Sequence, residues 1–271
     1  MALAPEDILA RILHADADVV VLDKPGGLPV HAGAKVQQHL EELLAMLDFG
    51  PGGPPRLVHR LDKDTSGCLV LGRTEAAVVS LGRLFRLRKV DKVYWAAVAG
   101  VPAQPAGRID LPLLKVAGET GARMVVDAAG RSAVTEYRVL ARSDRLAWLE
   151  LRPETGRTHQ LRAHCAALGT PILGDPIYGP IRPAPCPLHL HARAIRVPLD
   201  PDGAPLVAVA PVPAALGAAL AALGIDAGRP PEEWPEGWPL GPATTAPGPI
   251  SVAEVRPIPS SPEHGPGEDH V

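Results

Sequence analysis

Short apolar runs alternate with clusters of Gly, Pro and charged residues over the first 225 residues of the chain. Runs bounded by turn residues predict strands, whereas apolar positions spaced three or four apart predict helices. The expected strands are residues 18–22, 56–58, 68–72, 92–99, 123–127, 132–140, 146–151 and 188–191, and the expected helices are residues 36–47, 74–89, 158–168 and 212–223. This order predicts an α+β fold with a mixed, mainly antiparallel central sheet flanked by helices and loops.

The ends of two expected helices carry capping residues. Thr74 can cap the helix over residues 74–89, whose last turns are basic. Gly169 is suited to end the helix over residues 158–168, in which Leu161 and Cys165 lie on the buried stripe and Arg162 lies beside it.

One polar segment interrupts the apolar pattern. His59-Arg60-Leu61-Asp62-Lys63-Asp64-Thr65-Ser66-Gly67 lies between the apolar runs 56–58 and 68–72, so it predicts a charged loop between two short strands. Gly67 can adopt backbone angles that other residues resist, and the hydroxyls of Thr65 and Ser66 can bind backbone or a ligand. A solvated hairpin turn with ordinary surface charges is the alternative, because turns favour Asp, Ser and Gly.

Charge and composition divide the chain near residue 225. The net charge of the whole chain is −3, but residues 226–271 carry eight acids and two bases, which leaves the rest mildly basic. These residues also hold 11 of the 32 prolines and few apolar residues, a composition typical of disorder. We therefore expect an N-terminal extension over residues 1–17, one catalytic domain over residues 18–225 and a Pro-rich acidic tail over residues 226–271.

The remaining composition argues for a protein of the cytoplasm. No apolar run approaches the roughly 20 residues that cross a bilayer, and residues 1–7 do not have the basic start and apolar core of a secretory signal. The three cysteines, Cys68, Cys165 and Cys186, are widely spaced, and no ligand pair has a matching second pair, so we expect neither disulfides nor a metal.

The polar segment resembles a family signature. His59-Arg60-Leu61-Asp62 followed by Thr65-Ser66-Gly67 is similar to the catalytic motif of the RluA-type pseudouridine synthases. The resemblance continues through Lys92-Val93-Tyr94 and Gly156-Arg157-Thr158-His159-Gln160-Leu161-Arg162 to residues 169–179, in the order of the family, and covers about residues 18–213. It implies a single catalytic domain of the pseudouridine synthase fold.

The resemblance also assigns roles to residues. Asp62 is implied as the essential carboxylate, Arg162 as the cation beside it and Tyr94 as the aromatic residue against the uracil ring. Arg60 is implied to enter the RNA in place of the flipped nucleotide, and Leu161 to close the floor of the pocket. Thr65, Arg157 and His159 belong to the same motifs and are expected to bind substrate. The chemistry needs no cofactor, and a covalent sugar adduct and a glycal route both remain open.

The function expected from these residues is isomerisation of uridine to pseudouridine in ribosomal or transfer RNA. Because the first motif begins near Asp18, we expect no N-terminal S4 RNA-binding domain and therefore a compact target such as a stem-loop. We also expect a monomer. The alternatives are a catalytically silent RNA-binding protein of the same fold and a nucleoside hydrolase. The first conflicts with the presence of Asp62, Tyr94 and Arg162, and the second would release free uracil.

Overall fold

The computed structural model describes residues 3–33, 36–46, 49, 53–117, 123–180, 184, 186–200 and 203–224. The expected acidic tail and the C-terminal residue of the expected helix 36–47 lie outside the described residues. In the part of the chain that the structure describes, no helix is long and apolar enough to cross a membrane.

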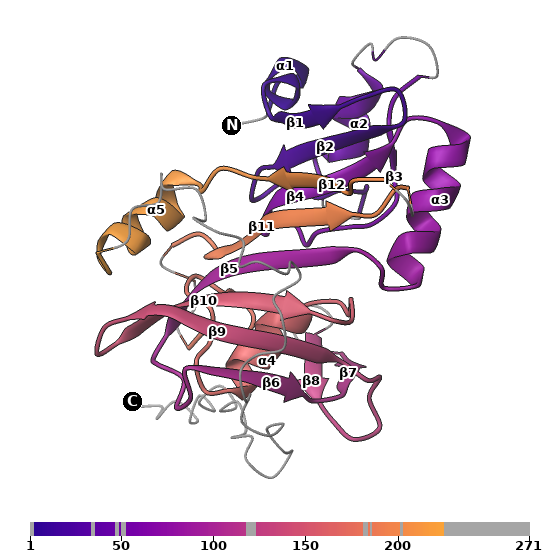
Figure 1. The fold of residues 1–271 in the computed structure, drawn as a ribbon. Coiled ribbons are helices and arrows are strands. Elements are labelled where there is room, and N and C mark those ends of the chain that lie inside the picture. Colours follow the sequence, from indigo (N-terminus) through magenta and orange to yellow (C-terminus); the bar gives the residue numbers. More distant parts are fainter. Residues whose placement is uncertain are drawn as a thin grey trace, which may run out of the picture.

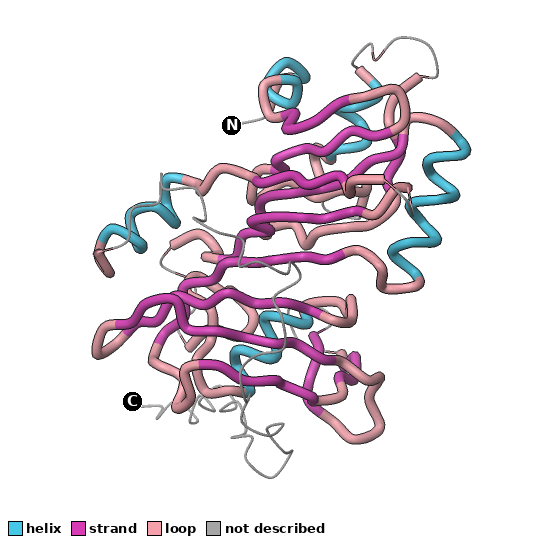
Figure 2. Tube along the Cα trace, in the orientation of Figure 1, coloured by secondary structure: helices cyan, strands magenta, loops and turns pink. Residues whose placement is uncertain are grey.

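A ten-stranded sheet forms the centre of the molecule (Figures 1 and 2). Its path runs β1-β2-β4-β11-β5-β10-β9-β6, with β12 paired to β11 and β3 paired to β4. Among these described strands β4 and β11 pair in parallel, whereas the other pairs are antiparallel. The predicted α+β fold with a mixed, mainly antiparallel sheet is therefore confirmed. The strands are β1 (Ile12–Ala15), β2 (Val19–Lys24), β3 (Arg56–Leu57), β4 (Ser66–Gly72), β5 (Asp91–Ala99), β6 (Ala106–Asp110), β9 (Val134–Arg142), β10 (Leu146–Pro153), β11 (Leu190–Val197) and β12 (Leu206–Val209).

Helices cover both faces of this sheet, so its central strands are buried on both sides. In β10, Trp148 packs toward the side of α5, while Leu149 packs toward α4, and both side chains have 0% exposure. Burial on both faces explains the nearly continuous apolar runs of the sequence. The helices are α1 (Pro5–Leu9), α2 (Leu40–Ala45), α3 (Glu75–Arg86), α4 (Gln160–Ala167) and α5 (Ala214–Ala221).

The two predicted caps are present. The Thr74 hydroxyl accepts a hydrogen bond from the amide of Ala77 at 3.1 Å at the start of α3. At the end of α4, Gly169 has a φ of +81°, and the amide of Thr170 donates to the carbonyl of Cys165 at 3.0 Å. This is the closure by a left-handed residue that glycine favours.

Several elements differ from the prediction. Helix α2 begins at Leu40 and not at residue 36, because His39 has extended backbone angles and its ring caps the amide of Glu42. Strand β8 (Arg123–Val126) pairs with β7 (Leu113–Val116) in a separate two-stranded sheet. The sequence did not predict β1, β6, β7 and β12. β1 pairs with β2 and forms one edge of the central sheet.

Candidate active site

The loop between β3 and β4 brings Asp62 to the surface of the sheet. β3 and β4 pair directly through Arg56 and Leu57, so the residues between them project as a loop, as the sequence predicted. Gly67 has a φ of +105°, and a Cβ at this position would lie 2.3 Å from the carbonyl oxygen of Ala192. Only glycine therefore lets β4 approach β11 at the end of the loop.

A buried lysine that the sequence reading did not single out holds this loop from below. The ammonium of Lys24 donates to the carbonyls of Pro25, Leu28 and Lys63 at 2.8, 2.9 and 3.0 Å, and the residue has 0% exposure. Burial lowers the pKa of Lys24 to about 7, although Asp64 and Asp62 oppose the shift. Three carbonyl acceptors match the three protons of an ammonium, which argues that the side chain is charged in the fold.

Arg162 lies between two carboxylates. Its guanidinium donates two hydrogen bonds to Asp175, from Nε at 2.7 Å and from Nη2 at 2.8 Å, and its Nη1 lies 3.6 Å from Oδ2 of Asp62. The expected cation beside Asp62 is therefore present, but its direct hydrogen-bond partner is Asp175. Asp175 lies within residues 169–179, the last stretch of the family resemblance, between Gly174 and Pro176, and the resemblance implies no role for it.

Asp175 is built to stay ionised. Burial alone would raise its pKa, but the hydrogen bonds and charge of Arg162 and the amides of Tyr178 and Ile177 hold the pKa of Asp175 below its ordinary value. Its side chain is fully buried, whereas that of Asp62 is 20% exposed. Asp175 is thus a fixed anchor for Arg162, and Asp62 faces the solvent-accessible side.

His159 is the second residue beside Asp62. It precedes α4 with a left-handed φ of +50°, and its Nε2 lies 4.0 Å from Oδ2 of Asp62. The Tyr178 oxygen accepts the amide of Met124 at 2.9 Å and lies 3.3 Å from Nδ1 of His159, so it can donate its own proton to that nitrogen. The remaining ring proton is then on Nε2, toward Asp62. Burial lowers the pKa of His159, opposed by Asp62 and helped by Arg162.

Tyr94 projects from β5 into the same site. It packs against both the core that contains Leu161 and the core that contains Leu61. Burial, and then the negative charge of Asp62, raise the pKa of Tyr94 well above its ordinary value. The phenol therefore keeps its proton near pH 7 and can donate a hydrogen bond or a proton.

His59 braces the loop. Its Nε2 accepts a hydrogen bond from the amide of Val70 at 2.8 Å, and its ring stacks on Phe85 with centroids 4.2 Å apart. Burial, and then the charge of Lys92, lower the pKa of His59 to about 3. A neutral ring is the form that can accept the Val70 amide.

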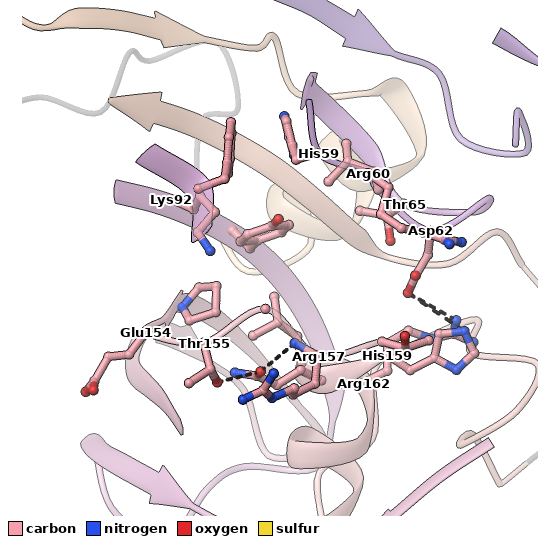
Figure 3. A pocket seen from close by; sticks show the side chains of 18 of the residues that line it. His59, Arg60, Asp62, Thr65, Lys92, Glu154, Thr155, Arg157, His159 and Arg162 are labelled. Carbon is pink, nitrogen blue, oxygen red and sulfur yellow. Dashed lines mark hydrogen bonds and ion pairs between the residues drawn. The ribbon is translucent and has the colours of Figure 1, made fainter. Parts of the chain in front are cut away.

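One cavity of about 580 Å³ contains all the predicted site residues (Figure 3). The loop residues Arg60, Asp62 and Thr65 form one wall, and the segment from Glu154 to Arg162 forms the opposite wall. Thr65 is buried, whereas Arg60 is exposed at the rim. The structure thus brings together the eight residues that the sequence singled out, which are Arg60, Asp62, Thr65, Tyr94, Arg157, His159, Leu161 and Arg162.

The chemistry available in this cavity is that of a carboxylate beside a fixed cation. Asp62 can act as a nucleophile, a base or a partner for developing positive charge, and Tyr94 can supply a proton. Among the described residues no three His, Cys, Asp or Glu side chains are grouped so as to hold a metal ion. That the protein uses neither metal nor cofactor stays a prediction.

Comparisons with known proteins point to one family. A family model described as RNA pseudouridylate synthase matches residues 18–167. An uncharacterized RNA pseudouridine synthase of Zymomonas mobilis is 44% identical over 208 residues, which cover 76% of this chain and 94% of that protein. The ribosomal large subunit pseudouridine synthase D of Xanthomonas campestris is 39% identical over 243 residues, which cover 83% of this chain and 73% of that protein.

A solved structure shows the same fold. Human RNA pseudouridylate synthase domain containing 4 is 33% identical and superimposes with a TM-score of 0.70. The superposition covers 81% of this chain and 95% of that chain.

Proposed function

The chain belongs to the RNA pseudouridylate synthase family, of the RluA type, and is an isomerase that forms pseudouridine in RNA, and on this premise we propose that Asp62 is its catalytic carboxylate. The single observation that carries the proposal is the position of Asp62. Its partly exposed carboxylate faces the cavity 3.6 Å from Arg162, a cation that Asp175 holds in place. An adjacent cation opposes the cost of keeping a carboxylate ionised in a desolvated pocket.

The reaction rearranges one nucleotide without adding or removing atoms. The N1–C1′ bond of uridine breaks, the uracil turns while it is held, and a C5–C1′ bond forms as C5 loses its proton and N1 gains one. Asp62 either attacks C1′ or removes the proton of C2′. We assign Tyr94 to the proton exchange at C5: its raised pKa keeps the phenol protonated, so the phenol takes the proton of C5 only as it gives its own proton to N1.

The target uridine must leave its stack to reach Asp62. We assign Arg60 to the space that the flipped base leaves, because Arg60 is exposed at the rim of the cavity in the same loop as Asp62. Leu161 and Thr65 are buried in the cavity wall, where they contact the uracil. Arg157 and His159, from the wall that also carries Leu161, bind the substrate backbone and the ribose.

The substrate is proposed to be a stem-loop of ribosomal or transfer RNA, and the protein to act as a monomer. The name of the Xanthomonas campestris relative supports ribosomal RNA. We also propose a cytoplasmic location, although several relatives carry mitochondrial names. Cell fractionation with an antibody against the protein tests the location, and mapping of pseudouridines in a deletion strain tests the target.

The activity itself is tested with purified protein and unmodified RNA transcripts. Pseudouridine should appear in the RNA, and no free uracil should be released. Free uracil would indicate the nucleoside hydrolase, and RNA binding without either product would indicate the catalytically silent RNA-binding protein.

A further inference from the structure

Arg88 occupies a backbone position that normally belongs to glycine. It follows the end of α3 with a left-handed φ of +58°, its amide donates to the carbonyl of Phe85 at 3.1 Å, and the amide of Lys89 donates to Leu84 at 3.0 Å. This is the same closure that Gly169 makes after α4. A side chain at such a position is strained, so local folding favours glycine where the chain has arginine.

The strained position lies at the cavity of Asp62. Among the described residues, Arg88 and His159 are the two non-glycine residues with positive φ, and both line this cavity. Strain that the fold tolerates is concentrated at functional sites. The side chain of Arg88 therefore has a use that offsets its conformational cost.

Two other arginines line the same cavity. Arg131 lies in the turn before β9, and Arg157 follows β10 and donates from Nε to the carbonyl of Ser132 at 3.0 Å. Arg88, Arg131 and Arg157 come from three separate segments, and none of them forms an ion pair with a carboxylate of the described residues.

The three guanidinium groups repel one another. Besides burial, the charges of Arg131 and Arg88 lower the pKa of Arg157, and the charge of Arg88 also contributes to the lowered pKa of Lys92. A cluster of like charges without a protein counterion is stabilised by a bound anion. Each of the three segments could carry a neutral residue at this position. Because all three carry an arginine, the shared positive charge points to such an anion.

We propose that Arg88, Arg131 and Arg157 form a binding site for one backbone phosphate of the RNA, next to the nucleotide that enters the cavity. The proposal rests on the proposed function for the identity of the ligand. The three residues come from separate segments that line one cavity, and they are close enough for the charges of Arg131 and Arg88 to lower the pKa of Arg157, so one phosphodiester bound by them would fix the strand while the base turns inward. Asp62 and Arg162 then act on a nucleotide whose backbone is already held.

The test compares RNA affinity among single variants. Arg88→Gly, Arg131→Gln and Arg157→Gln are each combined with Asp62→Asn, which keeps the RNA unmodified during the measurement. Arg142→Gln is the matched control, because Arg142 is exposed on β9 and does not line the cavity. The probe is a pool of unmodified transfer and ribosomal RNA transcripts, titrated over a range of salt concentrations.

Each of the three variants should bind RNA about three- to tenfold more weakly, with a salt dependence less steep by about one unit of slope. The control should stay within about twofold of the parent. Arg88→Gly should melt at the same or a higher temperature, since glycine suits its backbone. Loss of affinity without loss of stability then assigns the arginine to the ligand and not to the fold.

Two outcomes overturn the proposal. The first is that Arg88→Gly binds RNA with the same affinity and the same salt dependence as the parent. The other is that inorganic phosphate, at matched ionic strength, stabilises the protein against heat only when Arg88 is present, while RNA affinity does not depend on Arg88. The site would then hold a free anion. Pseudouridine formation by the unaltered protein is measured on the same RNA, so failure of the proposed function is seen separately from failure of this site.

Discussion

Arg162 binds Asp175 more closely than it binds Asp62. Two hydrogen bonds of 2.7 and 2.8 Å join Arg162 to the fully buried Asp175, whereas Asp62 lies 3.6 Å away. The three side chains together carry one negative charge in excess. This excess favours the positive charge that develops at ribose C1′ when the glycosidic bond breaks, and Asp175 holds the guanidinium in place beside Asp62.

Asp175→Asn should therefore impair both folding and catalysis. Removing the charge leaves Arg162 buried without its main partner, which costs about 3–5 kcal/mol for a broken buried pair. The freed guanidinium would turn toward Asp62 and compete with the substrate. Chemical denaturation measures the stability, and the initial rate of pseudouridine formation measures the catalytic effect.

The double variant Asp175→Asn with Arg162→Met provides the control for this prediction. It removes both charges, so it should recover part of the lost stability without recovering activity. Unchanged unfolding and unchanged rate in the single variant would show that Asp175 does not anchor Arg162.

Asp62→Asn should keep the fold and RNA binding but form no product. The amide is nearly isosteric with the carboxylate, yet it is neither a nucleophile nor a base. Asp64→Asn is the matched control, because Asp64 lies in the same loop but does not line the cavity. Product formation by Asp62→Asn above about a tenth of the wild-type rate would refute the assignment.

The sequence predicted the parts of the fold that have a strong local signal. The apolar runs located β2, β5, β9 and β10, and Thr74 and Gly169 marked helix ends. By contrast, β6 contains Gly, Arg and Asp within five residues, so its strand pairing depends on the neighbouring β9 and not on its own pattern.

The eight cavity residues could be predicted because contiguous motifs contain them, but their electrostatic support could not. Asp175 resembles an ordinary turn acid until the fold places it against Arg162, 13 residues away. Lys24 stands at the end of an apolar run, and only the tertiary structure shows that it is buried against the loop of Asp62. Partners of this kind depend on long-range contacts that have no periodic signature.

Lys24→Met should reduce turnover more than RNA affinity. Methionine fills the volume but leaves the carbonyls of Pro25 and Leu28 without this donor, and the loop at Lys63 loses its support. Each buried carbonyl left unpaired costs about 1–3 kcal/mol, which the smaller desolvation of methionine offsets in part. Single-turnover rates and RNA titrations separate the two effects.

Lys63→Met is the control for this prediction, because the Lys63 side chain is exposed in the same loop. It should leave stability unchanged. If Lys24→Met weakened RNA binding while turnover of bound RNA stayed normal, Lys24 would support the RNA-binding surface and not the position of Asp62.

Two buried histidines predict how stability depends on pH. Nδ1 of His164 accepts the Thr135 hydroxyl at 2.9 Å and its Nε2 donates to the carbonyl of Leu111 at 3.0 Å, so the ring is neutral. His191 likewise accepts from Ser66 at 2.9 Å. Burial lowers the pKa of each of these two histidines to about 4.

Unfolded histidine titrates near pH 6.5, so between about pH 6.5 and pH 4 the unfolded chain binds protons that the folded chain does not. Stability should therefore fall as the pH drops through this range, by about 1 kcal/mol for each histidine at pH 5.5, and these two residues should contribute no further loss below about pH 4. Urea unfolding at a series of pH values measures the slope.

His164→Gln removes one titrating ring. The slope reflects how many more protons the unfolded chain binds than the folded chain, and this difference should fall by about one in this range, whatever the effect of the variant on stability at pH 7. His31→Gln is the control for loss of an exposed imidazole, since the His31 ring is about half exposed. An unchanged slope in His164→Gln would mean that His164 is protonated in the folded protein, and the hydrogen bond from Thr135 would then have to be reversed.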